Sequence, residues 1–271
     1  MMAEVHLGND SRLLSVMNER VSVVLVETSH SGNIGAVARA MRNMGIANLR
    51  LVKPKDFPSD EAGARAAGAL ELLESASVYP TLSEAVADCH YVVGASARVR
   101  SFPWPVMNPR ESAEFVVNEL LITPEEASSS NVAYVFGRES SGLSNEELQQ
   151  CNAHVHIPAN PEYSSLNLAM AVQVMAYELR MACLASSQTA EAPVLSPGDE
   201  GWDAEACTHE EVEGMLAHLS RVMIATEFFD PQNPGQLLPR LRRLFQRRGL
   251  DKMEVNILRG MLKSIEKKLQ R

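Results

Sequence analysis

The sequence predicts an α/β domain built on a parallel sheet, followed by a small all-α extension. Residues 21–26 (VSVVLV) form a β-branched run, which is typical of a strand buried on both faces of a parallel sheet. Strand-like and helix-like patterns then alternate up to about residue 185, and amphipathic helical patterns follow residue 207. The 271 residues, of which 45% are hydrophobic and 22% charged, suit one large or two smaller globular domains.

The elements of the α/β domain can be placed in order along the chain. Further strands are expected at Asn48–Val52, near Val78, and at His90–Ala95, Asn131–Phe136 and His154–Ile157. Helices are expected at residues 34–44, 60–67, 82–88, 109–121 and 143–150, and from Ser165 to about Leu184. The extension should contain helices at Glu210–Phe229, Pro234–Arg248 and Lys252–Leu269.

These patterns divide the chain into four parts. Residues 1–20 precede the first strand, and residues 21–185 form the α/β domain. Residues 186–207 are polar and acidic with Pro, Gly and Ser, which is typical of a linker. Residues 208–271 form the basic helical extension, which is small for a hydrophobic core of its own.

The composition favours a cytoplasmic protein. The N-terminus has no signal-peptide pattern, and no apolar run is expected to reach the roughly 20 residues that span a bilayer. No membrane association is therefore expected. Four cysteines, too scattered for a zinc or redox motif, are expected to be reduced thiols: Cys89, Cys151, Cys183 and Cys207.

The net charge of −9 is unevenly distributed. Gln236–Arg271 carries eleven Lys or Arg against three Asp or Glu, so this segment has a net charge of +8 and the remainder −17. Five arginines lie close together in it without an intervening acid: Arg240, Arg242, Arg243, Arg247 and Arg248. Phosphates are their natural partners. A solvated amphipathic helix that packs its leucines on a neighbour is the simpler interpretation.

The predicted helix after Ser165 is apolar almost all round, with small residues between Leu, Met and Val. A helix of this kind is buried on several sides or lies in an oligomer interface. Its first turn nevertheless carries Ser164, Ser165 and Asn167, where the free N–H groups and the positive end of the helix dipole lie. These residues form either a simple N-cap or part of a ligand site.

Two other loops follow strands and carry polar residues. The segment GNIGAVA gives G-x-x-G-x-x-A, a weak match to the dinucleotide-binding pattern, with Asn33 just before the helix and Arg39 within it. The segment FGRESSGL places Arg138 and Glu139 at the end of a strand, and its G-x-x-S-x-G pattern is not a nucleophile elbow. A helix cap, a solvated face and a surface turn are the simpler interpretations.

These loops should converge, because the carboxyl ends of parallel strands meet at one edge of the sheet. Asn33–Arg39, Gly137–Leu143, Pro158–Asn167 and the short segment Ala95–Ala97 would together form a nucleotide-like ligand site. The sequence contains no phosphate-binding P-loop and no His, Cys or Asp cluster with metal-ligand spacing, so no metal is expected.

The three loops also carry a resemblance. N-I-G-A-V-A-R, V-F-G-R-E-S-S-G-L and I-P-A-N-P-E-Y-S-S-L-N-L-A-M-A-V-Q are similar to the three ordered motifs of the SPOUT-class (α/β-knot) RNA 2′-O-ribose methyltransferases. Within that class the chain resembles the bacterial tRNA (cytidine/uridine-2′-O-)-methyltransferases, from about Val21 to Leu184 and again in the basic extension. Residues 1–20 lie outside the resemblance.

The resemblance implies a deep trefoil knot, a homodimer whose chains jointly form each site, and S-adenosylmethionine as cofactor. The implied substrate is tRNA, at nucleotide 32 of the anticodon loop. By the same resemblance, the residues that contact the cofactor are Ala95, Ser96, Ala97, Gly137, Ile157, Ser164, Ser165 and Leu166. Those that meet the reacting ribose are Asn33, Arg39, Glu139, Ser165 and Asn167.

The implied reaction requires the ribose 2′-hydroxyl to lose its proton while it attacks the sulfonium methyl group in line. A guanidinium with a pKa above about 12 rarely gives up a proton, so Arg39 is better suited to hold the adjacent phosphate and stabilise developing alkoxide charge. Glu139 or a water then accepts the proton. The two alternative functions are a non-catalytic knotted RNA-binding protein and a nicotinamide-dependent oxidoreductase.

Overall fold

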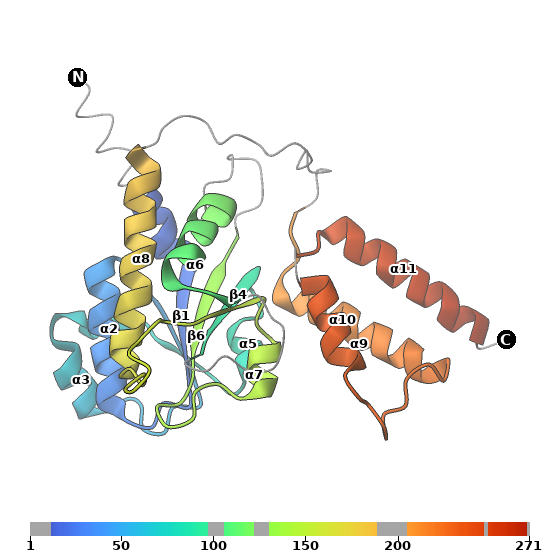
Figure 1. Cartoon of the computed structure of the whole chain (residues 1–271), viewed down its shortest axis with the longest axis horizontal. Coiled ribbons are helices and arrows are strands. Elements are labelled where there is room, and N and C mark those ends of the chain that lie inside the picture. The colour runs from blue at the N-terminus through green and yellow to red at the C-terminus, as the bar shows by residue number, and fades with distance from the viewer. Residues whose placement is uncertain (1–11, 97–105, 122–129, 189–204, 247–248, 270–271) are drawn as a thin grey trace.

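A seven-stranded parallel sheet forms the centre of the first 188 residues (Figure 1). The computed structural model describes residues 12–96, 106–121, 130–188, 205–246 and 249–269. The strands are β1 Val21–Val26, β2 Asn48–Val52, β3 Ser77–Tyr79, β4 Tyr91–Ala95, β5 Val106–Met107, β6 Val132–Phe136 and β7 Ala153–Val155. Their order is β3-β2-β1-β6-β4-β7-β5, and every neighbouring pair is parallel. The parallel α/β prediction is confirmed.

Helices cover both faces of the sheet. One face carries the larger core, beneath α2 Ser31–Met44, α3 Asp60–Ala66, α4 Leu70–Glu74, α6 Pro109–Phe115 and α8 Leu168–Gln188. The other face carries a smaller core, beneath α5 Leu82–Ala85 and α7 Asn145–Gln149. Alternate residues of β1 supply the two cores, which explains why this strand is apolar almost without interruption.

Several of the described helices begin with a capping box. Asn108, Ser144 and Thr208 each accept a hydrogen bond from the backbone N–H three residues later, and the glutamate at that position bonds back to the N-cap N–H. This reciprocal pairing satisfies two donors that would otherwise lack partners, so the N-x-x-E, S-x-x-E and T-x-x-E patterns fix where α6, α7 and α9 (His209–Ala225) begin.

Several predicted boundaries are wrong. The first helix begins at Ser31, so Asn33 lies inside its first turn, and α8 begins at Leu168. The predicted helix at 109–121 changes to a π-helical segment at Val116–Leu121. Residues 12–20 are helical, although no helix is expected there, and Met17 is fully buried in the larger core. Apolar spacing locates an element but does not determine which backbone N–H groups find partners at its ends.

The end of α8 corrects two further expectations. This helix continues to Gln188, beyond the predicted start of the linker at 186. Its window Leu168–Ser187 is also long and apolar enough, by length and composition alone, to cross a membrane. In the fold, however, the helix packs against α2 and α6, and its inner side chains Val172, Met175 and Leu179 are buried. The apolar run is therefore that of a core helix.

The extension folds into three helices with a small core of their own: α9 His209–Ala225, α10 Leu237–Gln246 and α11 Lys252–Leu269. Cys207, assigned to the linker from sequence, is buried in this core. The extension also docks on the α/β domain, because the N–H groups of His209 and Glu210 donate to the carbonyl oxygens of Cys89 and Ala87 at 2.7 and 3.2 Å. All four cysteines are buried and free, as expected.

The two glycines of the first motif allow α2 and α3 to pack closely. A Cβ atom at Gly35 would lie 2.0 Å from the carbonyl oxygen of Ala62, and one at Gly32 would lie 2.6 Å from a carboxylate oxygen of Glu61. The absence of a side chain at position 35 therefore lets two helix backbones meet. Close helix packing, rather than the approach of a phosphate, explains this part of the motif.

Replacing Gly35 by alanine should therefore destabilise the protein. We expect Gly35→Ala to lower the free energy of unfolding by about 3 kcal/mol or more, because Ala62 belongs to a backbone that cannot rotate away. Gly63→Ala is the matched control, because its Cβ would meet only Leu70 Cδ2, at 3.6 Å. In this control the free energy of unfolding should stay unchanged or rise by up to about 1 kcal/mol. Equal urea midpoints for the two variants would contradict the packing argument.

Candidate ligand-binding and catalytic site

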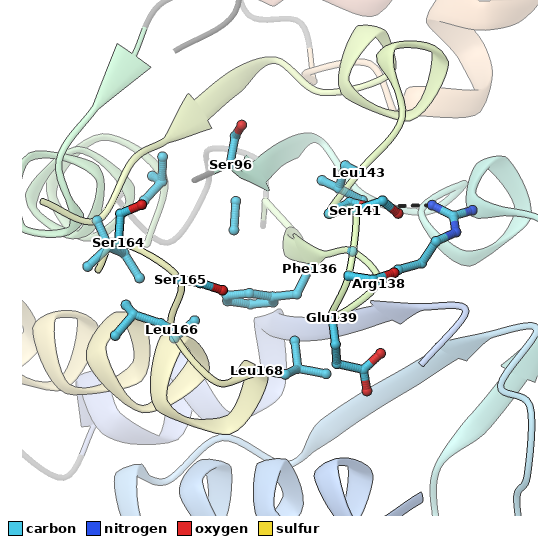
Figure 2. A pocket seen from close by; sticks show the side chains of 17 residues that line it. Ser96, Phe136, Arg138, Glu139, Ser141, Leu143, Ser164, Ser165, Leu166 and Leu168 are labelled. Carbon is cyan, nitrogen blue, oxygen red and sulfur yellow. Dashed lines mark hydrogen bonds between the residues drawn. The ribbon is translucent and has the colours of Figure 1, made fainter. Parts of the chain in front are cut away.

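A pocket of about 250 Å³ lies at the carboxyl edge of the sheet, where β4, β6 and β7 end. Figure 2 shows the loop with Ser141 and Leu143 on one side and the segment with Ser164, Ser165 and Leu166 opposite. The ring of Phe136 lies between them. The pocket combines apolar side chains with a few hydroxyl groups, the usual composition of a small-molecule site, and its volume is just below the common range of ~300–1,000 Å³.

The structure brings most of the cofactor residues expected from sequence into this pocket. Seven of them line it: Ala95, Ser96, Gly137, Ile157, Ser164, Ser165 and Leu166. The eighth, Ala97, lies outside the described residues. Sequence reasoning missed Phe136, Leu143 and Leu168, which supply apolar surface. These residues lie in or next to the sequence motifs, which could have indicated that they belong to the site. Nothing in the sequence indicated that their side chains line the pocket.

The loop after β6 is held in a tight turn by its glycines. A Cβ atom at Gly137 would lie 2.2 Å from the carbonyl carbon of Gly142, and Gly142 itself has φ of +69°. The N–H of Gly142 donates to the carbonyl oxygen of Arg138 at 2.8 Å, which closes the turn. Both glycines are therefore required by backbone geometry, and the turn forms one side of the pocket.

Arg138 links this loop to two other segments. Its Nε donates to Glu27 at the end of β1 (2.9 Å), and its two terminal nitrogens donate to both carboxylate oxygens of Glu147 in α7 (3.0 and 2.9 Å). The hydrogen bond from Arg138 is the largest cause of the lowered pKa of Glu27. Because its guanidinium is fully engaged, Arg138 positions the loop and offers no free positive charge to a ligand.

The carboxylate of Glu139 caps the N-terminus of α2. Its Oε2 accepts from the N–H and hydroxyl of Ser29 at 3.0 and 2.8 Å, and its Oε1 accepts from the N–H of His30 at 3.3 Å. Partial burial raises the pKa of Glu139, but the hydrogen bonds from Asn33 and Ser29 outweigh it, so the pKa falls to about 2. Glu139 therefore remains ionised at neutral pH.

A chain of amide side chains extends from this carboxylate. Asn33 Nδ2 donates to Glu139 Oε1 at 2.8 Å, and Asn167 Nδ2 donates to Asn33 Oδ1 at 3.0 Å. Asn167 also caps α8, because its Oδ1 accepts from the N–H of Ala169 at 2.9 Å. The N-cap interpretation of Asn167 and the ligand-site interpretation therefore do not exclude each other. We call Ser29, Asn33, Glu139 and Asn167 the Glu139 network.

The Glu139 network argues against a dinucleotide site. In such a site the pyrophosphate binds at the free N–H groups of the first helix N-terminus. Here the carboxylate of Glu139 accepts from the N–H groups of Ser29 and His30, directly before the helix, so an anion already stands at this position, and the nearby Arg138 is already paired. A nucleoside that carries a positive charge and lacks a phosphate group fits the pocket better. No group of three or more potential metal ligands occurs among the described residues.

The same network weakens Glu139 as a proton acceptor. A carboxylate with a pKa of about 2 is a poor base for a hydroxyl, and it would have to give up hydrogen bonds to receive the proton. Of the two acceptors expected from sequence, Glu139 is therefore disfavoured. Glu139 is better placed to hold Asn33 and Asn167 in fixed orientations.

Of the predicted reaction residues, Arg39 alone belongs neither to the pocket nor to the Glu139 network. It is exposed on α2, six residues beyond Asn33 on the same ridge of i+3 steps, and it does not line the pocket. A rise of 1.5 Å per residue separates the two by about 9 Å along the helix axis. Its guanidinium makes no ion pair with a described residue, so it can bind a phosphate of a large substrate.

Replacing Glu139 should cost stability in a pH-dependent way. We expect Glu139→Gln to lower the free energy of unfolding by roughly 1 kcal/mol at neutral pH, because the amide nitrogen of the glutamine would face hydrogen-bond donors. The folded pKa of about 2 lies below the ordinary 4.5, so the carboxylate contributes stability that is present above 4.5 and lost as the pH falls towards 2. The difference in unfolding free energy between wild type and variant should shrink over that interval. The exposed Glu146→Gln should show almost no difference at any pH.

Each domain of the chain matches a known protein family. Residues 20–177 match the SpoU rRNA Methylase family, and residues 210–271 match the C-terminal domain of the tRNA methyltransferase TrmJ. The chain is 52% identical over 250 residues to the tRNA (cytidine/uridine-2′-O-)-methyltransferase TrmJ of Cronobacter sakazakii, covering 92% of this chain and 97% of that protein.

Two further relatives cover both domains. The chain is 49% identical over 251 residues to the tRNA (cytidine/uridine/adenosine-2′-O-)-methyltransferase TrmJ of Pseudomonas aeruginosa, covering 93% of this chain and 95% of that protein. The crystal structure of TrmJ from Z. mobilis superposes with a TM-score of 0.74 at 33% identity, covering 90% of this chain and 98% of that one. The chain therefore belongs to the SpoU methylase family, within its TrmJ group.

Proposed function

We propose that this protein transfers a methyl group from S-adenosylmethionine to the 2′-hydroxyl of a cytidine or uridine in tRNA, at nucleotide 32 of the anticodon loop. The observation that carries the proposal is the presence of the pocket and the Glu139 network in a chain about half identical, over both domains, to TrmJ enzymes. The name of the Pseudomonas relative also includes adenosine. Nucleoside mapping of the methylated tRNA therefore also determines which bases are accepted.

The pocket suits this cofactor. An adenine ring can lie against the apolar side chains, and the Ser164 hydroxyl group offers a hydrogen bond to ribose or to the amino-acid end. Arg138 carries no free positive charge that would repel a sulfonium, and the ionised Glu139 lies at the edge of the same pocket. When bound, the cofactor supplies an electrophilic methyl group.

The roles of the reaction residues follow from their positions. Ser165 and Asn167 hold the target ribose beside the pocket, and the Glu139 network keeps Asn167 in one orientation. Arg39 binds the phosphate next to that ribose and stabilises the charge that develops on O2′ as its proton passes to water. Positioning of the two reactants can alone lower a barrier of this kind by several kcal/mol, about 7–11 in the best cases.

Methyl transfer to tRNA provides the test. Tritiated methyl transfer from S-adenosylmethionine to unmodified tRNA, followed by nucleoside mapping, should find 2′-O-methylcytidine or 2′-O-methyluridine at position 32. Arg39→Ala should lower turnover at least tenfold and leave cofactor affinity nearly unchanged, because Arg39 lies outside the pocket. Arg42→Ala is the matched control, since Arg42 is exposed on the same helix and pairs with Glu71. Cofactor and tRNA binding without any transfer would favour the non-catalytic alternative.

The outer face of α8 supports a homodimer. Met170, Tyr177 and Met181 lie on one stripe of this helix and are 62%, 48% and 41% exposed, whereas its opposite side is buried in the core. Exposed apolar side chains gathered on one helix of a folded domain mark an interaction surface. We propose that a second copy of the chain covers this stripe and completes the site.

Sedimentation equilibrium at micromolar concentration tests the dimer. We expect a mass near twice 29.7 kDa for the wild type. The double variant Tyr177→Glu and Met181→Glu should dissociate, because two carboxylates would be desolvated at the interface. Met253→Glu, at an exposed apolar position in α11, is the control and should remain dimeric. A wild-type monomer would contradict the shared-site proposal.

The basic extension supports a second contact with tRNA. Its arginines differ in whether they have a partner within the protein. Arg240 is exposed, whereas Arg242 donates to Glu213 at 2.6 Å, so the expectation that all five lack a local partner is wrong for Arg242. Arg247 and Arg248 lie outside the described residues. Arg242 lies opposite an acid of α9 because α10 packs across that helix, a tertiary contact that the sequence does not reveal.

Two variants of α10 should therefore behave differently. Arg240→Ala with Arg243→Ala should weaken tRNA binding and reduce the slope of log K against log salt by nearly one unit for each phosphate that the protein no longer binds. Arg242→Ala should mainly destabilise the extension, because it leaves Glu213, whose pKa is raised by burial, without its partner. Filter binding of tRNA from low to high salt and thermal melting distinguish the two effects. Unchanged affinity and slope in the first variant would make α10 a structural element only.

A further inference from the structure

The loop that follows β2 carries two positive charges with no assigned role. Lys53 and Lys55 are the only lysines that precede Lys252 in the sequence, and both are exposed. Neither ammonium group forms an ion pair or hydrogen bond with any residue that the structure describes.

The loop is held against the site by backbone hydrogen bonds. The N–H of Lys55 donates to the carbonyl oxygen of Thr28 at 3.1 Å, and the next residue, Ser29, holds the Glu139 carboxylate. The N–H of Lys53 donates to the carbonyl oxygen of Tyr79 at 3.1 Å. The two lysines therefore stand at the same edge of the sheet as the pocket, close to the Glu139 network.

The backbone at this edge is strained. Lys53 has φ of +45° and Glu27, at the end of the neighbouring strand, has φ of +48°, and neither is a glycine. Such conformations persist only where the surrounding structure fixes them, and they concentrate at functional sites. The strain at Lys53 turns the chain directly after β2 and keeps the two lysine positions fixed relative to the site.

Nearby acids do not neutralise these charges. Glu27 is the carboxylate whose pKa both lysines influence, but its own ion pair is with Arg138 at 2.9 Å. Asp56 is adjacent in sequence and exposed, without an ion pair to either lysine. The ammonium groups are thus available to an external anion. Because neither lysine lines the pocket, that anion must be large enough to extend beyond it.

We propose that Lys53 and Lys55 bind the phosphate backbone of the RNA strand that enters the site. This inference rests on the proposed function and adds to it a contact surface within the α/β domain, separate from the basic extension. Lysine is suited to this role because it binds phosphate as a mobile point charge, without demanding a fixed geometry from a flexible strand. The surface fixes the strand and does not take part in methyl transfer.

The test uses the full-length protein with Lys53→Asn and Lys55→Gln combined. Asparagine tolerates the left-handed backbone at position 53, so the fold should be retained. The charge-preserving pair Lys53→Arg and Lys55→Arg is the matched control. Affinity for an unmodified tRNA transcript is measured from about 50 to 200 mM salt, with cofactor affinity by calorimetry and methyl transfer under steady state.

The neutral variant should bind tRNA about tenfold more weakly, and its slope of log K against log salt should fall by about 1.4, at ~0.7 for each single-strand phosphate. Its KM for tRNA should rise while its turnover at saturating tRNA and its cofactor affinity stay unchanged. The arginine variant should match the wild type. An unchanged salt slope, or a loss of cofactor affinity, would overturn the proposed surface. A wild-type protein that methylates no tRNA would instead contradict the proposed function.

Discussion

The carboxylate of Glu139 at the N-terminus of α2 is the interaction on which the site depends. It joins segments far apart in the sequence: its own loop after β6, the connection from β1 into α2 through Ser29 and Asn33, and, by way of Asn33, the start of α8 at Asn167. The free N–H groups of a helix terminus attract an anion. Here the protein supplies that anion itself, and the hydrogen bonds it accepts lower the pKa of Glu139 to about 2 and keep the network charged.

This arrangement explains why a glycine-containing helix start does not bind a phosphate-rich cofactor. Gly35 serves the contact between α2 and α3, and the carboxylate of Glu139 is bound to the backbone directly before α2. Arg138, the other charge at this edge, is paired with Glu27 and Glu147. Apart from these two bonded charges, the pocket presents apolar surface and hydroxyl groups. Arg39 and the loop after β2, whose positive charges have no ion pairs among the described residues, lie outside it. A nucleoside-type cofactor and a polyanionic substrate are thereby assigned to different places.

The two domains contribute to this division in different ways. The α/β domain forms the pocket, and the helical extension docks through backbone hydrogen bonds onto the segment Ala87–Cys89, which precedes β4. This docking segment lies at the opposite end of β4 from Ala95 and the pocket, while α10 also contacts α7. A long substrate such as tRNA can contact both regions at once, whereas a small cofactor meets only one.

The sequence by itself determined the order and type of most elements, because a strand buried on both faces and a helix with one apolar side leave different periodic patterns. The motif residues Asn33, Gly137, Glu139, Ser165 and Asn167 could be placed at one sheet edge, because parallel strands end together. Only the tertiary structure decided that Glu139 caps α2, that Arg242 pairs with Glu213, and that Gly35 faces Ala62. Each of these depends on which backbone or side-chain groups from distant segments meet, and no local pattern in a chain records that.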